Sequence, residues 1–260
     1  MATVKNTDDI AKVRRAAQTA AGILDYLTPY IKAGITTAEI EHLTRERIKE
    51  LGIRSATIGY GDPPFPAAIC TSINHVVCHG IPGEKKLKDG DIVNLDITIE
   101  EDGWFGDTSR MFMIGKPSIL ARRLVETTFE CMWKGIRAVK PGATLGDIGH
   151  AIQTHAEAAG FSVVRDYCGH GIGQVMHEDP QVLHYGKPGT GLKLEKGMIF
   201  TIEPMINAGK YHTSLLGDGW TVVTKDRSLS AQWEHQLIVT DDGYEVLSTS
   251  PGMPEPPPAE

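Results

Sequence analysis

The sequence predicts an α+β protein made of two related halves, in which helices flank antiparallel strands. Two helical segments precede the first β-like runs, and the order helix, helix, strands then recurs. Segment 31–52 aligns with segment 139–160 at a constant offset of 108 residues, with six identities in 22 aligned positions. Shared helix-cap chemistry accounts for about half of these identities. The remaining identities indicate two halves related by a pseudo-two-fold axis. A solenoid would need more than two repeats, so it is not expected.

Local signals place the two helices of the first half. From Thr7, acids in the first turn and apolar residues near helical spacing predict a helix that ends before Pro29. Thr36 and Glu39 form a capping box that begins a second helix, and Gly52 ends it. Both helices therefore precede any strand.

The remaining elements follow in the same order. Alternating or apolar runs bounded by Pro, Gly and Asp predict strands around 68–72, 91–100 and 103–114. Helices are predicted over about 117–138 and 144–159, followed by a strand-like run at 161–167. We expect one domain, residues 1–250, with halves of about 7–115 and 116–248. The tail 251–260 is Pro-rich and is expected to be extended or disordered.

Composition excludes several classes of protein. The 260 residues are 41% hydrophobic and 23% charged, as in an ordinary soluble globular protein. The net charge of −7 argues against a dedicated nucleic-acid binder. No long apolar run suits a membrane span, and the polar start lacks a secretory signal, so we expect no membrane partner and a cytoplasmic location. The four cysteines form no C-x-x-C pair and are expected to be free thiols.

Two aspartates stand out in the strand-like stretch 94–110. In an antiparallel hairpin with an even-numbered turn, Asp96 and Asp107 fall on one face. A two-residue turn at Asp102-Gly103 makes them diagonal neighbours, and a turn centred one position earlier places them directly opposite each other. In either register their Cβ atoms lie within roughly 5 to 8 Å. Like charges so placed repel unless a cation lies between them, and a hard metal ion would serve. Alternatively, a bulge turns one aspartate toward water.

Further metal ligands occur downstream. His170 stands between glycines, and Glu203 and Glu234 interrupt apolar strand-like runs. A carboxylate in a buried strand is costly unless it is paired, protonated or bound to metal, so each residue could also be a structural histidine or an ion-paired core acid. Four carboxylates and one imidazole suit a pair of Mn, Fe, Co or Zn ions better than a structural zinc site. No H-E-x-x-H motif is present.

Five motifs, in order, carry a resemblance to a known family. They are SINHVVCHGIP, NLDITIEEDGWFGDTSRMF, YCGHGIGQVMHEDP, IFTIEPM and TKDRSLSAQWEHQLIVT. Over essentially its whole length the chain resembles type I methionine aminopeptidase, and the absence of an N-terminal zinc-finger extension favours the bacterial form. The resemblance implies the pita-bread fold and two divalent metal ions per chain, of uncertain identity among Co, Mn, Fe and Zn. It also implies hydrolytic removal of the initiator methionine from nascent proteins and peptides, preferring a small second residue.

The resemblance assigns roles to individual residues. It implies the metal ligands Asp96, Asp107, His170, Glu203 and Glu234, with Asp107 and Glu234 bridging the two ions. A hydroxide held between the ions would be the nucleophile, and Glu203 would pass its proton to the leaving amine. His177 would hydrogen-bond the substrate carbonyl or oxyanion, and His79 the scissile nitrogen. A capped loop histidine is the alternative for His79.

The resemblance also implies a pocket for the methionine side chain. Its expected walls, which could instead be plain core, are Tyr60, Phe65, Cys70 and Trp220, which offer aromatic and sulfur contacts to a thioether. Met176 stands where relatives often carry phenylalanine, and Phe65 where tyrosine is frequent. These departures affect the shape of the pocket and leave the reaction intact.

Other interpretations fit the sequence less well. X-Pro peptidases of the same fold carry a substantial extra N-terminal domain, and the type II enzyme carries a helical insertion before Glu203. A non-catalytic binding module of this fold would have lost metal ligands. Action on nascent chains implies transient ribosome contact, for which Lys85, Lys86 and Lys88 are candidates, and a monomer is expected.

Overall fold

A computed structural model describes residues 3–4 and 6–259 of the chain. Its helices are α1 (Thr7–Leu27), the 3-10 turn η1 (Thr28–Tyr30), α2 (Thr37–Leu51), α3 (Ile119–Arg137) and α4 (Leu145–Ala158). The strands of the first half are β1 (Arg54–Ser55), β2 (Cys70–Ile73), β3 (Val76–Cys78), β4 (Ile92–Glu101) and β5 (Trp104–Met113). Those of the second half are β6 (Ser162–Val163), β7 (Gly169–Gly171), β8 (Glu178–Val182), β9 (Ile199–Ile202), β10 (Met205–Asn207), β11 (Thr213–Leu215), β12 (Val222–Thr224), β13 (Ser230–Gln232), β14 (His235–Val239) and β15 (Tyr244–Val246).

Capping decides where the helices begin. Helix α2 starts with the predicted capping box, since the Thr36 hydroxyl accepts from Glu39 N and the Glu39 carboxylate accepts from Thr36 N. Helix α4 repeats this box with Thr144 and Asp147. Helix α1 runs from Thr7 to Leu27, as predicted, and Asn6 is its N-cap. The Asn6 side chain accepts from the backbone N–H three residues on, which a residue already inside the helix cannot do.

The β4–β5 hairpin has the first of the two registers considered, with its turn at Asp102-Gly103. Asp102 and Gly103 form its two-residue turn, both with positive φ (51° and 79°), as the twist of the flanking strands requires. Asp96 pairs with Ser109 and Thr98 with Asp107, so the two aspartates are diagonal neighbours on one face of the hairpin. The predicted even-numbered turn is confirmed.

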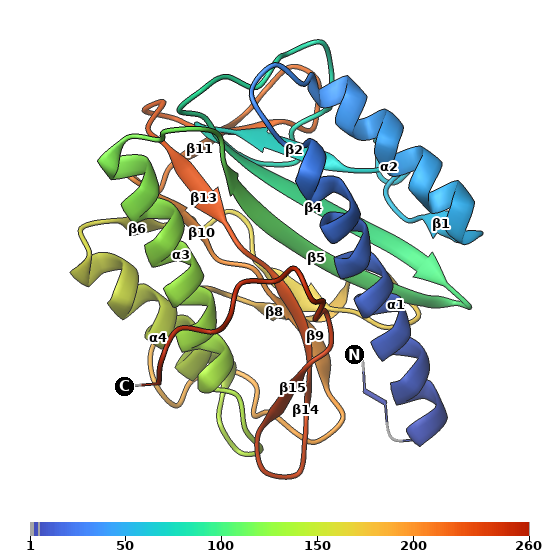
Figure 1. Cartoon of the computed structure of the whole chain (residues 1–260). Coiled ribbons are helices and arrows are strands. Elements are labelled where there is room, and N and C mark those ends of the chain that lie inside the picture. Colours follow the sequence, from blue (N-terminus) through green and yellow to red (C-terminus); the bar gives the residue numbers. More distant parts are fainter. Residues whose placement is uncertain (1–2, 5, 260) are drawn as a thin grey trace.

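The strand pairings repeat between the halves. β4 lies between β1 and β5, and β10 lies between β6 and β13. The pair Arg54↔Glu100 recurs as Ser162↔Asn207, at nearly the offset read from the sequence. Figure 1 shows α1 and α2 beside the strands of the first half and α3 and α4 beside those of the second. The predicted α+β architecture with antiparallel sheets is confirmed.

Two further sheets complete the second half. One has the order β15-β14-β9-β7-β8, and the other joins β11 and β12 to β3 of the first half. The chain therefore leaves one sheet and enters another between β9 and β10, and again between β13 and β14.

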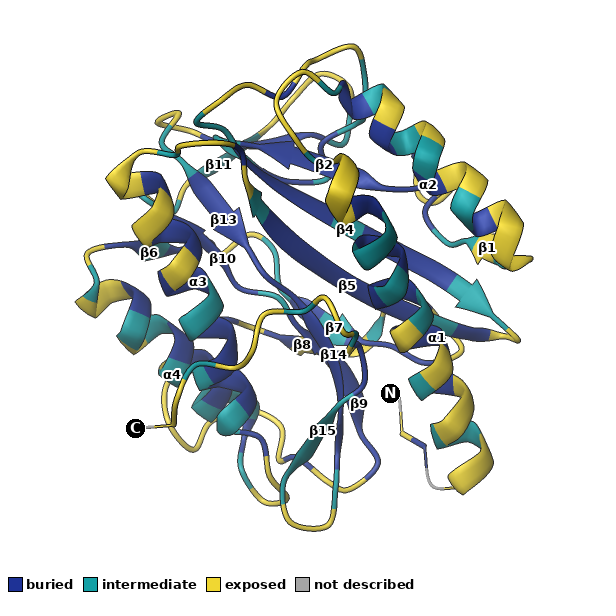
Figure 2. Cartoon of the chain, viewed as in Figure 1, coloured by how far each residue is buried: buried dark blue, intermediate teal, exposed yellow. Residues whose placement is uncertain are grey.

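The helices cover two hydrophobic cores. One core packs α1 and α2 on the hairpin, and the other packs α3 and α4 on β9, β10, β13 and β14. In Figure 2 the strands are buried while the outer faces of the helices are exposed. Helix α1 approaches β5 most closely at Gly106, where a Cβ atom would overlap the Ala16 carbonyl. The helix can therefore lie flat on the strand only because residue 106 has no side chain.

Direct hydrogen bonds join the halves beneath the helices. The Asn94 amide donates to the Gln232 carbonyl (2.8 Å), and the Thr108 hydroxyl donates to the Glu234 carbonyl (2.9 Å). An isolated bridge pairs Ser109 with Glu234. The hairpin of the first half is thereby fixed against β13 and β14.

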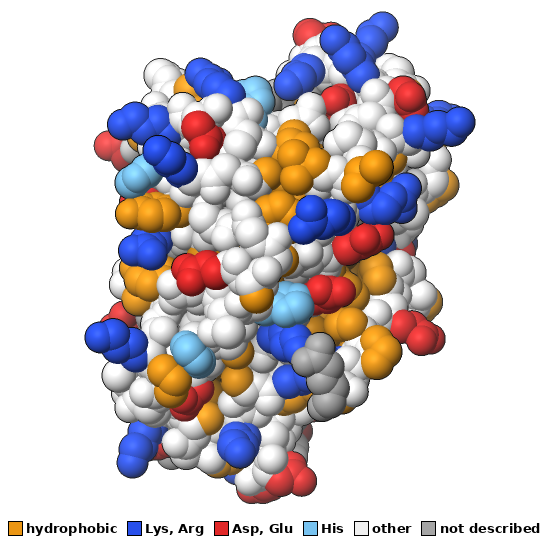
Figure 3. Space-filling view, turned by 90° about the vertical axis from the view of Figure 1, so that its left-hand side faces the viewer, with side chains coloured by type: hydrophobic (Ala, Val, Ile, Leu, Met, Phe, Trp, Pro, Cys, Tyr) orange, Lys and Arg blue, Asp and Glu red, His pale blue; other side chains and the backbone are white. Residues whose placement is uncertain are grey.

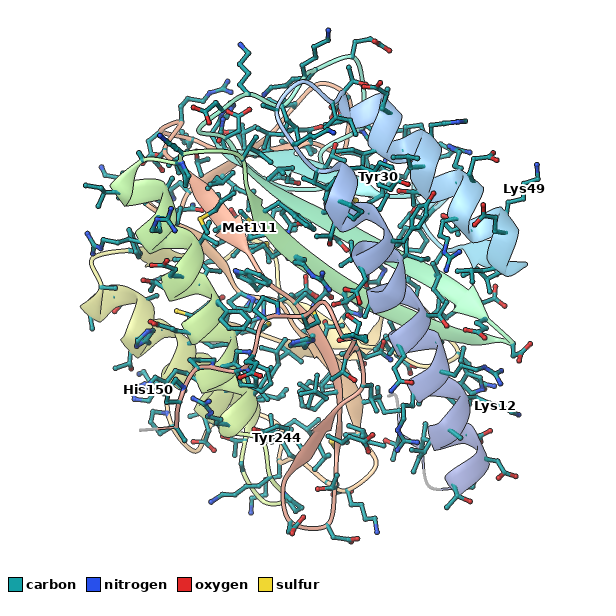
Figure 4. The ribbon with its side chains drawn as sticks, in the orientation of Figure 1. Lys12, Tyr30, Lys49, Met111, His150 and Tyr244 are labelled. Atoms are coloured by element: carbon teal, nitrogen blue, oxygen red, sulfur yellow. The ribbon has the colours of Figure 1, made fainter. Side chains whose placement is uncertain are left out.

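The surface and the tail add little regular structure. Basic and acidic side chains are interspersed on the face shown in Figure 3. Labelled Lys12 and Lys49 point away from the protein in Figure 4. The tail forms no helix or strand over residues 251–259, and the Arg137 guanidinium donates to the Pro257 and Pro258 carbonyls. Among the described residues, no helix is both long and apolar enough to cross a bilayer.

Candidate metal centre and active site

A cavity of about 500 Å³ is lined by side chains from both halves. Its walls include all the residues that the sequence singled out: Asp96, Asp107, His170, Glu203, Glu234, His79, His177, Tyr60, Phe65, Cys70 and Trp220. These residues lie up to 174 positions apart in the chain, from 60 to 234. The fold therefore brings the predicted ligands and pocket residues to one place.

Each acid occupies a distinct position in the sheets. Asp96 and Asp107 project from the hairpin β4–β5. Glu203 and Glu234 were expected inside strands, but they lie at two of the junctions where the chain changes sheets, between β9 and β10 and between β13 and β14. Pro204 explains the first junction, because a proline has no N–H to continue a strand ladder.

The imidazole of His170 lies among the carboxylates. Its Nε2 is 3.6 Å from Asp107 Oδ2 and 3.5 Å from Glu203 Oε1. Possible ligand atoms of Asp107, His170 and Glu234 all lie within 4.8 Å of one another. Asp96 stands close enough to Asp107 and Glu203 for their charges to raise its pKa. The arrangement is a compact group of one nitrogen and several oxygen donors.

Hydrogen bonds orient the donors before any ion arrives. His170 Nδ1 lies 3.0 Å from the Gly171 carbonyl, which can only accept, so Nδ1 carries the proton and Nε2 is left for a cation. The Thr201 hydroxyl accepts from His170 N (3.0 Å) and donates to Glu203 Oε1 (2.7 Å). The Thr98 hydroxyl likewise donates to Asp107 Oδ1 (2.9 Å).

The electrostatics of the cavity favour a bound cation. Burial, reinforced by the neighbouring carboxylates, raises the pKa of Asp96 and of Glu234 well above their ordinary values. Burial also raises the pKa of Glu203, to about 7. Burial alone would lower the pKa of His170, but Asp107 and Glu203 raise it to about 9. No lysine or arginine occurs among the described residues of the cavity wall, so a divalent metal ion would suit the several carboxylates better than the single charge of His170.

Two more histidines face the cavity. Burial lowers the pKa of His79 to about 4, so its ring is neutral, and it packs edge-on against Tyr167 and Trp220. The ring of His177 lies 4.2 Å from that of His170, centroid to centroid. His177 Nδ1 lies 2.7 Å from the Tyr60 hydroxyl, which belongs to the other half.

One wall of the cavity is aromatic and sulfur-rich. Phe65 packs edge-on against Trp220, with 5.2 Å between the ring centroids, and Cys70 is buried beside them. Met176, Cys78, Cys168 and Met205 also line the cavity. All four cysteines are free thiols, as predicted.

Three supporting residues were missed by the reasoning from sequence. Thr201 joins two candidate ligands, Gln232 donates to Glu203 Oε2 (3.2 Å), and His184 Nε2 accepts from Glu203 N (3.1 Å). Threonine, glutamine and neutral histidine carry no charge that would be costly to bury, so they did not stand out in the sequence. The only signal was for Thr201, which lies two residues before Glu203.

Comparison with known proteins places this site in a family. The model of metallopeptidase family M24 matches residues 11–241. The chain belongs to metallopeptidase family M24. As expected of an M24 metallopeptidase, the cavity offers oxygen and nitrogen donors for divalent metal.

Close relatives within family M24 are methionine aminopeptidases. That of Rickettsia prowazekii is 53% identical over 251 residues, covering 96% of each chain. That of Escherichia coli strain K12 is 52% identical over 248 residues, covering 95% of this chain and 93% of the relative. The predicted membership of the methionine aminopeptidase group is confirmed.

Solved structures of family M24 agree. The crystal structure of the Rickettsia prowazekii methionine aminopeptidase matches with a TM-score of 0.93 and 52% identity, over 96% of this chain and all of the other. The Xaa-Pro dipeptidase of Bacillus anthracis matches with a TM-score of 0.75 at 23% identity, over 96% of this chain but 63% of the dipeptidase. The likeness to the dipeptidase shows a shared fold and nothing about activity. Together the two structures confirm the predicted pita-bread fold.

Proposed function

We propose that this protein is a metal-dependent aminopeptidase that hydrolyses the peptide bond after an N-terminal methionine, acting on nascent proteins and peptides in the cytoplasm. The observation that carries the proposal is one cavity in which five oxygen and nitrogen donors from both halves face an aromatic and sulfur-containing wall. The identity of more than 50% to methionine aminopeptidases over nearly the whole chain supports it.

Asp96, Asp107, His170, Glu203 and Glu234 would hold two divalent ions. The buried carboxylates have no lysine or arginine partner on the described cavity wall, and the Gly171 carbonyl holds the proton of His170 on Nδ1, so the donor set fits metal ions. When bound, the ions would lower the pKa of water and polarise the scissile carbonyl. The oxygen-rich donor set suits Mn, Fe, Co or Zn.

Glu203 would move the proton during hydrolysis. As a metal ligand its carboxylate would lie within reach of both the attacking water and the leaving amine, so it could accept a proton from the first and return it to the second. Thr201 and Gln232 each donate a hydrogen bond to one of its carboxylate oxygens, which fixes the orientation of the carboxylate. The geometry is therefore set before substrate binds.

The two histidines would contact the substrate. His177 would donate a hydrogen bond to the substrate oxygen as negative charge develops on it. His79, neutral and held between Tyr167 and Trp220, would contact the scissile nitrogen.

The aromatic wall would bind the methionine side chain. Tyr60, Phe65, Cys70 and Trp220 line the cavity beside the donor group, and Met176 adds a flexible side chain to the wall. Thioether contacts with aromatic edges are favourable by roughly 0.3 to 1.5 kcal/mol each. A small second residue is preferred because it would lie beside the metal ligands.

Peptide assays test the proposal. We expect methionine release from Met-Ala-Ser only after Mn, Fe, Co or Zn is added to the chelator-treated protein, and no release from X-Pro peptides. Cleavage of X-Pro peptides without cleavage of Met-Ala-Ser would contradict it.

A ribosome contact is a separate part of the proposal. Lys85, Lys86 and Lys88 are exposed on the loop beside the start of α2, where Thr37 N donates to the Lys85 carbonyl. Replacing all three by glutamate should weaken co-sedimentation with ribosomes and leave peptide hydrolysis intact. Unchanged co-sedimentation would rule out this surface.

A further inference from the structure

Tyr60 and His177 meet across the cavity from opposite halves of the chain. The Tyr60 hydroxyl lies 2.7 Å from His177 Nδ1, and the ring centroids are 5.1 Å apart. Tyr60 belongs to the loop between β1 and β2, and His177 to the loop between β7 and β8. This hydrogen bond is therefore a direct polar contact between the two halves at the cavity.

The loop that carries Tyr60 is held in place by its own backbone. Tyr60 N donates to the Thr57 carbonyl (3.0 Å), Phe65 N donates to the Tyr60 carbonyl (2.8 Å), and Gly59 N donates to the Phe65 carbonyl (2.8 Å). Gly61, with φ of 77°, lies against the Trp220 ring, where a side chain would collide. The phenol is thus fixed at the position where it meets His177.

The direction of the Tyr60–His177 hydrogen bond decides what His177 can do. A neutral imidazole has one N–H, on either Nδ1 or Nε2, whereas a phenol can donate or accept. With Nδ1 engaged by the phenol, Nε2 is the nitrogen left for a substrate. Nε2 can donate to a substrate oxygen only if the proton resides there, and Nδ1 must then accept from the Tyr60 O–H.

We propose that Tyr60 is a positioning residue whose hydroxyl donates to His177 Nδ1 and so fixes the tautomer that presents an N–H at Nε2 to the substrate. This inference rests on the proposed function, in which His177 donates to the developing oxyanion. It gives Tyr60 a role beyond that of a wall of the methionine pocket. Contact with the methionine side chain requires only the aromatic ring of Tyr60, whereas fixing the His177 tautomer requires its hydroxyl group.

Tyr60→Phe separates these two roles, because it removes the oxygen and keeps the ring. We expect kcat for Met-Ala-Ser at pH 8 to fall about tenfold while KM changes less than about twofold. Tyr30→Phe is the matched control, since Tyr30 is as exposed as Tyr60 (40% each) but lies on η1, outside the described cavity wall (Figure 4). The control should retain full activity.

A double-mutant cycle tests whether Tyr60 acts through His177. In the His177→Ala background, the additional Tyr60→Phe change should alter kcat by less than about twofold. Independent, multiplicative losses would overturn the proposal, and so would an increase in kcat for Tyr60→Phe, which would mean that the hydrogen bond merely obstructs the cavity.

A spectroscopic measurement gives a second readout that does not depend on turnover. In zinc-loaded protein labelled with ¹⁵N-histidine, two-bond ¹H–¹⁵N correlation should show His177 protonated at Nε2. Tyr60→Phe should convert that signal to a mixture of tautomers. A wild-type proton on Nδ1 would overturn the proposal, even if methionine release by the wild type were normal. If the wild type releases no methionine, the proposed function fails and this measurement still decides the tautomer.

Discussion

Glu203 receives hydrogen bonds on both carboxylate oxygens and lies 3.5 Å from the His170 ring. Burial raises the pKa of Glu203 to about 7 in the metal-free cavity, against the lowering effects of the His170 charge and of these two hydrogen bonds. The carboxylate is thereby oriented at the donor group, where it could accept a proton from a water and pass it on.

Glu203→Gln should remove this capacity while keeping the side chain's size. We expect kcat for Met-Ala-Ser to fall by roughly 10² to 10⁴, with peptide binding changed only a few-fold. Metal content should be measured alongside, since Glu203 is also a proposed ligand. Glu46→Gln, at an exposed position on α2, is the control, and near-normal turnover of Glu203→Gln would exclude the proposed proton transfer.

The pKa of His170, raised to about 9, predicts how stability of the metal-free protein depends on pH. Between its ordinary pKa of 6.5 and about 9, the folded chain retains a proton that the unfolded chain has lost. The free energy of unfolding should therefore fall as pH rises from 7 to 9, by about 2 kcal/mol from this group. Thermal melts in chelator measure it, and a flat profile over this window would contradict the prediction.

Saturating Zn or Mn should abolish that fall. A bound metal ion requires neutral His170, so the folded chain then has no proton to lose in this window. Two other histidines act in the opposite direction below pH 6.5, because burial lowers the pKa of His184 and of His235 to about 3. The stability these histidines contribute is lost as pH falls from 6.5.

At the scale of elements, the position of α1 on the hairpin depends on Gly106. Gly106→Ala would push a methyl group into the α1 backbone at Ala16 and Ala17, and overpacking of this kind costs roughly 1 to 3 kcal/mol. Chemical denaturation should show this loss.

Gly22→Ala is the control for this change, because the same substitution at residue 22 of α1 meets no atom within 4 Å. It should stabilise by about 0.5 to 1 kcal/mol through helix propensity. Equal effects of the two substitutions would mean that close packing at Gly106 is unimportant.

The elements also show how far sequence reasoning reached. The hairpin register was predictable, because Asp102-Gly103 suits a two-residue turn and parity then fixes every pair in the ladder. Caps likewise fixed both ends of α2. The short strands of the second half were mostly not predicted individually, because two to five residues are too few to show a period. The positions of Glu203 and Glu234 could not be predicted either, because they depend on which strands pair in the folded chain, and local sequence patterns do not show that pairing.

At the scale of the molecule, a buried ion pair fastens the C-terminal segment to the first half. The Arg110 guanidinium, 4% exposed, donates to Asp25 Oδ1 (2.9 Å), and Ser250 and Gly252 also donate to the Asp25 carboxylate. Helix α1, strand β5 and the chain after β15 therefore share one carboxylate.

Asp25→Ala should leave the Arg110 charge buried without this partner. We expect a loss of about 3 kcal/mol in the free energy of unfolding, measured by urea titration, because breaking one side of a buried pair is costly. Glu50→Ala removes the partner of Arg47 in a more exposed pair on α2 and should cost less than about 1 kcal/mol. Similar losses in the two variants would show that burial of the Arg110 pair has no effect.

The division of the donor set between the halves has a consequence for a split protein. The first half supplies Asp96 and Asp107, and the second supplies His170, Glu203 and Glu234. A chain cut in the loop 114–118 would yield two fragments, neither of which contains the whole set. Divalent ions bind most strongly where all five donors meet, so by mass action they would tighten the association of the fragments. The candidate metal centre would then act as a clasp, and metal-dependent complementation would report how firmly the halves hold each other.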